Sequence, residues 1–374
     1  MVMMNVWIIV VLLLLLIPTI FGILAKIIKL MEDKKNEQDV LKFIKNNPEK
    51  ASIFAIYNDY PLLEYQADKK MPLASTLKII IAIEFARQAD IKAIDIKELV
   101  PLKELDKYFI KNTDGGAHLN WIESLRNNNQ INQGQVSLFQ VAKGMIEFSS
   151  NANTEFLINK LGLEKINQVL KILTLERHDP LFPISSANLI CTYIQSKNGM
   201  TFKETLKEIK GMTYEEYANK AIEINQLLKD DKDMALINQL NTKDIYNNRF
   251  QVIASQKQPT STTKEYANLM QAIRKRKFLT SNAQDILQEI MNIIPNEGSS
   301  LIDLGLKGGS SISILTTAFY SKDEDGNTMD MAIFIHDPSR MDLLWIQNKF
   351  NLFIGKFATD KHFREEVVRT LYVE

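Results

Sequence analysis

The chain begins with a long, uninterrupted apolar segment, and alternating apolar and polar positions start only after it. Residues 6–25 carry no charged side chain over twenty positions, which is long enough for one helix to cross a bilayer. Trp7 is placed to anchor such a helix at the membrane interface. No charged stretch precedes the segment and no small-residue cleavage pattern follows it. We therefore expect an uncleaved transmembrane anchor within residues 1–30 and a charged linker over residues 31–47.

Beyond that segment, the hydrophobic pattern alternates between strand and helix periods. Residues 52–57 and 62–66 read as a β-hairpin around a polar turn, and the run 79–83 is apolar all round, as in a buried helix. Ser137 is a predicted N-cap for an amphipathic helix whose apolar positions are Leu138, Val141, Ala142, Met145 and Ile146. A second helix over 153–161, closed by Gly162, follows at once.

The last third of the chain returns to strands. Residues 301–307 and 312–320 read as strands, and 329–336 reads as a returning strand after a polar turn. An amphipathic helix around 343–353 ends the pattern. We predict an α/β layered domain, an antiparallel sheet flanked by helices, plus an all-helical subdomain, with a cleft between them. An extra segment, about 202–250, carries polar amphipathic helices; it is a solvated insertion, a lid or a partner surface.

Composition narrows the possible functions. The formal net charge is zero and no glycine-rich phosphate loop is present, so no nucleic-acid partner is expected. The single cysteine, Cys191, excludes an internal disulfide framework, and its apolar neighbours indicate a buried structural thiol. The four histidines show no metal-ligand spacing, so neither a metal nor a cofactor is expected: His118, His178, His336 and His362.

The candidate chemistry begins with Ser75 and Lys78. Residues three apart share a helix face, so the spacing predicts that the Lys78 amine reaches the Ser75 hydroxyl. A serine hydroxyl is a weak nucleophile until a base takes its proton, and a neutral lysine can be that base. Taken alone, the same pattern also fits an N-capping serine followed by a solvated lysine.

Two later motifs change this interpretation. Ser149-Ser150-Asn151 falls where one predicted helix ends and the next begins, and Lys307-Gly308-Gly309-Ser310 lies on a predicted strand. The order Ser-x-x-Lys, Ser-x-Asn and Lys-x-Gly resembles that of the serine β-lactamase and penicillin-binding protein superfamily, most closely its class A β-lactamase-like serine hydrolases. The resemblance covers residues 48–358 and leaves 359–374 as a C-terminal tail.

The resemblance implies a role for each motif residue. Ser75 would be the nucleophile and Lys78 its base, while Ser149 would relay a proton to the leaving group. Asn151 would orient Lys78 and bind the substrate amide. The strand residues Lys307, Gly308, Gly309 and Ser310 would hold the substrate, with the backbone N–H groups of Ser75 and Ser310 forming an oxyanion hole.

Two departures from the family pattern limit what it implies. The loop over residues 176–188 lacks the glutamate that activates the deacylating water in class A β-lactamases; His178 is a weaker candidate for that base. Gly308 stands where the family has a hydroxyl residue that helps to hold a substrate carboxylate. Efficient lactamase activity and a substrate with a terminal carboxylate are both less expected for these reasons.

We therefore expect a membrane-anchored serine acyl hydrolase or transferase, D,D-peptidase-like or esterase-like, acting on peptidoglycan-like peptides or related acyl substrates. A class A-like β-lactamase acting on β-lactams and a non-catalytic scaffold on the same fold are the alternatives. The resemblance implies an extracytoplasmic catalytic domain. The lysines that follow the predicted span imply the opposite by the positive-inside rule: Lys26, Lys29, Lys34 and Lys35.

Overall fold

The computed structural model describes residues 32–231, 235–295, 298–337 and 342–372. The predicted anchor over residues 6–25 lies outside these ranges. Among the residues that the structure describes, no helix is both long and apolar enough to cross a membrane.

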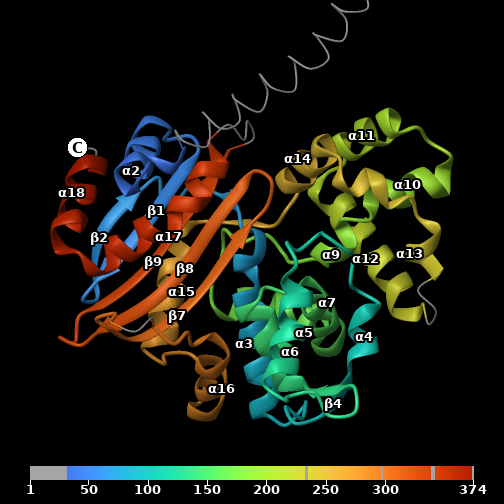
Figure 1. Ribbon diagram of the computed structural model, residues 1–374, viewed down its shortest axis with the longest axis horizontal. Helices are drawn as coiled ribbons and strands as arrows, with labels where there is room; N and C mark the ends of the chain where they lie inside the picture. Colours follow the sequence, from blue (N-terminus) through green and yellow to red (C-terminus); the bar gives the residue numbers. More distant parts are fainter. Residues whose placement is uncertain (1–31, 232–234, 296–297, 338–341, 373–374) are drawn as a thin grey trace, which may run out of the picture.

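An antiparallel sheet of five strands, in the order β2-β1-β9-β8-β7, forms the first layer of the molecule (Figure 1). The strands are β1 (Ala51–Tyr57), β2 (Tyr60–Tyr65), β7 (Leu301–Ser310), β8 (Ile314–Asp323) and β9 (Thr328–His336). Both predicted hairpins are therefore confirmed, and they meet where β1 pairs with β9. β8 and β9 are buried on both faces, which explains their nearly continuous apolar sequences. β2 and β7 form the two edges.

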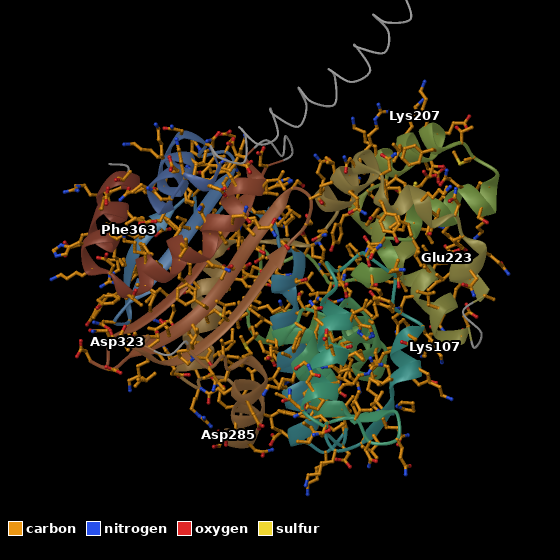
Figure 2. All side chains as sticks on the ribbon, in the orientation of Figure 1. Lys107, Lys207, Glu223, Asp285, Asp323 and Phe363 are labelled. Atoms are coloured by element: carbon orange, nitrogen blue, oxygen red, sulfur yellow. The ribbon has the colours of Figure 1, made fainter. Side chains whose placement is uncertain are left out.

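Helices cover both faces of the sheet. On one face lie α2 (Glu37–Asn46), α17 (Leu343–Thr359) and α18 (Lys361–Leu371), and on the other lies α15 (Thr263–Arg274) (Figure 1). The expected linker over 31–47 and the expected tail over 359–374 therefore contain helices that belong to the domain. α2 buries Val40 and Ile44, and α18 buries Phe363, in one core with the sheet. Figure 2 marks the position of Phe363 on α18. The apolar stripes of α2 and α18 are narrow and are flanked by charged residues, which is why the sequence pattern predicted a linker and a tail in these two places.

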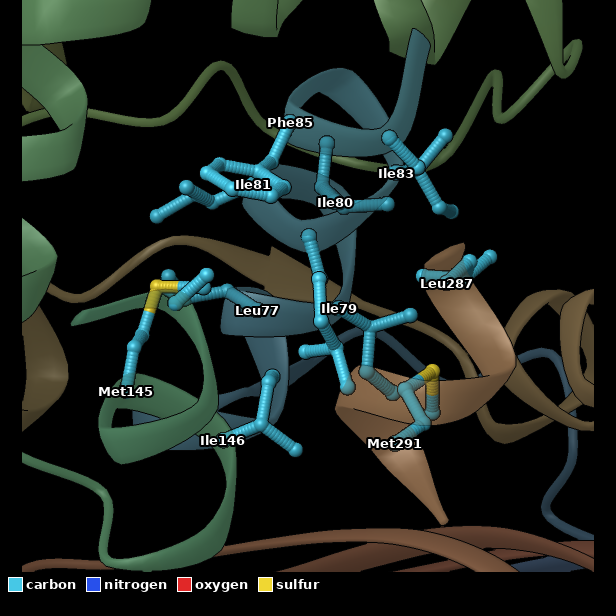
Figure 3. Packing of buried hydrophobic residues seen from close by; sticks show 14 of the residues in the cluster. Leu77, Ile79, Ile80, Ile81, Ile83, Phe85, Met145, Ile146, Leu287 and Met291 are labelled. Atoms are coloured by element: carbon cyan, nitrogen blue, oxygen red, sulfur yellow. The ribbon is translucent and has the colours of Figure 1, made fainter. Parts of the chain in front are cut away.

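The helical subdomain is built around α3 (Lys78–Asp90), which is buried on all sides as its apolar run predicts (Figure 3). Ile146 of α6 and Leu287 of α16 are among its neighbours (Figure 3). The other helices and short strands of this region are η1 (Ala74–Leu77), α4 (Leu102–Asp106), α5 (Ala117–Asn127), α6 (Leu138–Glu147), α7 (Asn151–Leu161), α8 (Leu163–Ile172), α9 (Ile184–Ala187), α16 (Ser281–Met291), β3 (Met71–Pro72), β4 (Leu99–Pro101), β5 (Gln135–Ser137) and β6 (Thr260–Ser261). The Ser137 cap is confirmed, since its side chain accepts a hydrogen bond from the Gln140 N–H.

The extra segment forms a helical lobe around a hydrophobic core that is separate from the cores beside α3 and beside the sheet. Its elements are α10 (Ile190–Asn198), α11 (Phe202–Gly211), α12 (Tyr214–Asp230), α13 (Ala235–Gln239), η2 (Thr242–Tyr246) and α14 (Asn248–Gln256). The lobe is longer than the predicted 202–250, because residues from Phe182 to Ala254 contribute to its core, to which Tyr108, Ile110 and Ala152 also belong. Charged side chains such as that of Lys207 point outward from it (Figure 2).

Both ends of this lobe are fixed at one place. The Asp179 N–H donates to the Thr260 carbonyl over 2.9 Å, and the Thr260 N–H donates to the Asp179 carboxylate over 3.0 Å. Thr260 also belongs to β6, which pairs with β3 just before Ser75. The chain therefore leaves the domain at Asp179 and returns to the same point at Thr260.

Candidate active site

Ser75 lies on a rigid turn between sheet and helix. It belongs to the 3₁₀ helix η1, which runs directly into α3. Ala74, just before it, has a φ of 46°, in the left-handed region that costs energy for a residue with a Cβ. Thr316 on β8 fixes the turn: its hydroxyl donates to the Leu73 carbonyl over 2.8 Å and lies 2.7 Å from the Thr76 hydroxyl. Among the described residues the Ser75 hydroxyl has no hydrogen-bond partner.

Lys78 is fully buried below this turn. Its amine donates to the Ser149 carbonyl over 2.7 Å and to the Asn151 amide oxygen over 2.9 Å, and it lies 3.3 Å from the Ser149 hydroxyl. The Lys78 amine does not form the expected hydrogen bond with Ser75, because it donates to Ser149 and Asn151 instead. The predicted orientation of Lys78 by Asn151 is present.

Burial lowers the pKa of Lys78 well below its ordinary value, and the nearby cation Lys307 lowers it further. Asp114 and Glu155 oppose this shift. This shift favours the neutral amine, which carries the lone pair that a general base needs.

The Ser149 hydroxyl lies between the amines of Lys78 and Lys307. Ser149 has a φ of 68° between α6 and α7, which turns its hydroxyl toward Lys307 on β7. The Lys307 amine donates to that hydroxyl over 3.0 Å and to the Gly308 carbonyl over 2.7 Å. Burial lowers the pKa of Lys307 to about 7. A single hydroxyl thus lies within reach of two buried amines whose pKa values are both lowered by burial.

The adjacent glycines Gly308 and Gly309 of β7 differ in how much space surrounds them. A Cβ at Gly309 would lie 2.6 Å from the Ser75 nitrogen and 2.9 Å from the Leu73 oxygen, so the strand approaches the nucleophile turn as closely as glycine allows. A Cβ at Gly308 would meet nothing closer than 3.7 Å. Gly309 is therefore required by packing, whereas Gly308 leaves open the space that a hydroxyl residue could fill.

The serines and glycines of these motifs line a cavity of about 680 Å³, below which Lys78 and Lys307 are buried. Its lining includes Ser75, Ser149 and Asn151, together with Gly308, Gly309 and Ser310 of the third motif. Further lining residues, which the sequence did not predict, come from the loop before α5, from the end of α6, from in and after α9 and α14, and from the first half of α17: Thr113, Asp114, Gly115, Phe148, Ile184, Asn188, Gln251, Ala254, Ser255, Gln258, Leu343, Leu344, Gln347, Phe350 and Asn351.

His178 is not a base for this cavity. Its ring nitrogens lie 2.6 Å from the Asp179 carbonyl and 2.9 Å from the Tyr266 hydroxyl, and it is absent from the cavity lining. Burial lowers its pKa to about 4. The loop instead presents Ile184 and Asn188 to the cavity.

Glu155 is a buried carboxylate that the sequence analysis missed. It accepts hydrogen bonds from the Ser185 N–H over 2.6 Å, the Ser186 hydroxyl over 2.9 Å and the Asn225 side chain over 2.6 Å. It therefore ties α7, the loop that ends in α9, and α12 of the lobe together. The local sequence around Glu155 does not reveal this role, because the residues that bind its carboxylate lie 30 or more positions away along the chain.

Metal and thiol chemistry have no centre in the described residues. No group of three or more histidine, cysteine, aspartate or glutamate side chains in those ranges is placed to hold a metal ion. Cys191 is buried, as predicted, and burial raises the pKa of its thiol to about 12.

Comparison with known proteins agrees with this architecture. A model of the beta-lactamase enzyme family matches residues 35–338. A class A beta-lactamase representative from Bacteroides cellulosilyticus superposes with a TM-score of 0.51 at 14% identity, covering 90% of this chain and 99% of that one. The TLA-1 extended-spectrum beta-lactamase gives 0.51 at 13% identity, covering 90% and 99%. No curated protein matches the chain.

Proposed function

The chain belongs to the beta-lactamase enzyme family, and we propose that it is a serine acyl hydrolase or transferase working through an acyl-enzyme on Ser75. The observation that carries this proposal is the environment of Lys78. The side chain is fully buried, its pKa is lowered well below the ordinary value, and Asn151 and Ser149 hold its amine beside the nucleophile turn. A lysine that served only packing would not need two partly buried polar partners and a second buried lysine next to it.

Acylation starts at the Ser75 hydroxyl. As its oxygen bonds to the substrate carbonyl carbon, its proton passes to the lone pair of neutral Lys78. Because Lys78 contacts Ser149 rather than Ser75 in the resting site, the amine swings toward Ser75 or the proton travels through the Ser149 hydroxyl. The backbone N–H groups of Ser75 and Ser310 then stabilise the oxyanion, worth roughly 3 kcal/mol for each donor.

Collapse of the tetrahedral intermediate breaks the bond to the leaving group. The leaving atom takes a proton from the Ser149 hydroxyl, which is replaced from Lys78 or Lys307, both within 3.3 Å. The acyl group on Ser75 then passes to water or to an acceptor amine or hydroxyl. The attacking water, amine or hydroxyl loses one proton, and the departing Ser75 oxygen gains one through Lys78, which restores the Ser75 hydroxyl and neutral Lys78.

The substrate that we propose is a cell-wall peptide or a related acyl compound, cleaved in a D,D-peptidase-like or esterase-like reaction. We further propose that the predicted N-terminal anchor holds the enzyme at the membrane with its catalytic domain outside the cytoplasm. We expect a penicilloyl group on Ser75 to be lost slowly, in contrast to the rapid β-lactam hydrolysis of a true β-lactamase. Ile184 and Asn188 line the cavity where a loop base would be needed, and neither side chain is a base at neutral pH.

Intact-mass analysis tests the proposal directly. The full chain in detergent, and a Ser75→Ala control, are incubated with benzylpenicillin and separately with a fluorophosphonate. We expect an adduct with each reagent that the control lacks, and we expect the penicilloyl adduct to persist. Absence of any adduct would favour a scaffold protein, and rapid turnover of the penicillin would favour a true β-lactamase.

A further inference from the structure

A groove of about 1360 Å³ lies between the edge strand β2 and the terminal helix α18. β2 forms the opposite edge of the sheet from β7, the strand that carries Lys307 (Figure 1). In the described ranges, no residue lines both this groove and the cavity that contains Ser75. α18 also lies outside the segment that the beta-lactamase family model matches. The groove is therefore a separate feature of this chain, and a ligand can occupy it without entering the active site.

Helix α18 presents one face to the core and another to the groove. Phe363 and Val367 pack into the core beside the sheet. Lys361, Glu365 and Arg369 recur at every fourth position, so they share a different face, which is exposed and lines the groove. The stretch that the sequence predicted to be a C-terminal tail is thus a folded helix with a charged stripe along the groove.

The groove carries an excess of positive charge. The charged residues that line it are four cations and one carboxylate: Lys45, Lys361, Arg364, Arg369 and Glu365. Lys361 and Glu365 approach each other only loosely, at 3.9 Å. The side chains of Lys45 and Arg369 are exposed, and no described residue forms a hydrogen bond or ion pair with either of them. Because the formal net charge of the chain is zero, this excess is a local property, and it suits an anionic ligand.

Apolar and aromatic side chains also line the groove. Leu62 and Val368 are half-buried there, and the Tyr65 hydroxyl donates to a carbonyl of α2 over 3.0 Å. Arg364 is already engaged, since its guanidinium lies 4.4 Å from the centre of the Tyr57 ring and donates to two carbonyls near the end of α17. Three exposed cations and a preformed apolar surface thus remain for a ligand.

β2 also offers its backbone to a ligand. It is a terminal strand of the sheet and pairs with β1, so its other edge has no partner strand among the described residues. Such an edge can accept an extended peptide as an added strand, held by main-chain hydrogen bonds. Pro61 lacks an N–H, which restricts this pairing to the part of β2 that follows it, beside Leu62 and Tyr65 of the groove. Alternate side chains of an added strand share one face of the sheet, so one set of them would point toward α18.

We propose that this groove docks an acidic segment of a partner protein. The segment adds to β2 as an extended strand, with carboxylates at alternate positions facing Lys45, Lys361 and Arg369. A peptide suits the groove better than a lipid headgroup does, because only a peptide can use both the exposed cations and the open strand edge. Recognition of this kind does not involve Ser75, and it places the partner at the far edge of the sheet while the active site stays open.

Fluorescence anisotropy with the full chain in uncharged detergent tests the proposal. The probe is a short fluorescein-labelled peptide of alternating glutamate and threonine, and its matched control carries glutamine in place of glutamate. We expect the glutamate peptide to bind roughly 3- to 100-fold more tightly, the combined effect of three exposed ion pairs. Raising the salt concentration from about 0.1 to about 1 M shortens the screening length from about 10 to about 3 Å and should remove most of this difference.

Substitutions in the groove should change the affinity in opposite directions. Lys45→Gln and Arg369→Gln each remove one cation and should weaken binding of the glutamate peptide roughly 2- to 5-fold. Glu365→Gln removes the carboxylate of the groove and should strengthen binding by a similar factor. Lys207→Gln makes the same charge change at an exposed position of the helical lobe and is the matched control that should leave the affinity unchanged (Figure 2). Circular dichroism shows whether each variant is folded.

Backbone pairing is tested separately with two methylated peptides. One carries an N-methyl group on every glutamate, and the other carries it on every threonine. Neighbouring N–H groups of an extended chain point toward opposite edges, so only one of the two sets can pair with β2. We therefore expect one methylated peptide to lose at least about fivefold in affinity and the other to bind like the parent peptide.

Four results would overturn the proposal. Equal affinity for the glutamate and glutamine peptides, or binding that the groove variants leave unchanged, would show that these cations do not select the ligand. Equal effects of the two methylations would show that the peptide does not pair with β2. Binding of dihexanoylphosphatidylglycerol, a soluble anionic lipid, without binding of the glutamate peptide would reassign the groove to a lipid. Dimerisation that Lys45→Gln and Arg369→Gln abolish, again without peptide binding, would identify a second copy of the chain as the occupant.

Discussion

Replacement of Gly309 by alanine is the sharpest test of how closely β7 approaches the nucleophile. The added Cβ would lie 2.6 Å from the Ser75 nitrogen, 2.7 Å from the Thr316 hydroxyl and 2.9 Å from the Leu73 oxygen. The first contact is roughly 0.8 Å shorter than ordinary van der Waals contact. Two of the three atoms are backbone, so rotation of a side chain cannot relieve the overlap. The strand and the turn must move apart.

The expected losses follow from that movement. Overpacking of this kind lowers the free energy of unfolding by about 1–3 kcal/mol. Displacement of Ser75 by a large fraction of 1 Å from β7 also spoils the geometry of attack, and such a shift reduces the rate on the order of 100-fold. We therefore expect Gly309→Ala to fold with reduced stability and to acylate slowly.

Gly308→Ala is the matched control on the same strand. Its Cβ would meet nothing closer than 3.7 Å, and its partner on β8, Thr317, does not obstruct it. Urea unfolding and the rate of fluorophosphonate labelling are measured for both variants. We expect Gly308→Ala to stay within about threefold of the unaltered rate. If Gly309→Ala acylates as fast as Gly308→Ala, the close approach of β7 does not position Ser75.

Three further predictions concern the groups around the cavity. Asp114→Asn removes a negative charge that raises the pKa of Lys78. Since acylation requires neutral Lys78, the pH at which the acylation rate reaches half its maximum on the acidic side should fall. A rise in that pH would contradict the prediction. Glu155→Ala leaves several buried donors without an acceptor and should lower the free energy of unfolding in urea by roughly 3 kcal/mol, and a loss below about 1 kcal/mol would show that the cluster is not structural. Ile184→Glu places a carboxylate in the cavity and should shorten the lifetime of a penicilloyl adduct by roughly tenfold or more, as followed by intact mass; an unchanged lifetime would mean that this wall does not reach the ester.

The sequence predicted the parts of the site that are close in the chain or carried by a periodic pattern. The two hairpins, the buried helix after Ser75 and the loop at Ser149 each have a local signal, either alternation, a long apolar run or a capping residue. The motif order supplied the long-range assembly. The membrane anchor and its orientation stay predictions, since residues 6–25 lie outside the described ranges.

What the sequence did not predict depends on contacts across large separations. Ser255 reaches Ser311 across 56 positions, and Asn225 reaches Glu155 across 70. A polar residue on one helix has no pattern that names its partner on another, so the wall formed by α14 could not be assigned. The contact of Lys78 with Ser149 in place of Ser75 has the same origin, because helix spacing alone cannot reveal a competing acceptor.

The closure of the lobe at Asp179 and Thr260 has a consequence for how such a protein can diversify. The two ends of the lobe are hydrogen-bonded to each other, so the domain sees the same two attachment points whatever the length of the segment between them. The entropic cost of closing such a segment grows only slowly with its length. The segment can therefore become longer or shorter, or be replaced, with little effect on the rest of the domain. The same segment supplies α14 to the cavity. Natural variation in this one segment can therefore alter which acyl groups are accepted while the serine, the two lysines and the sheet stay as they are.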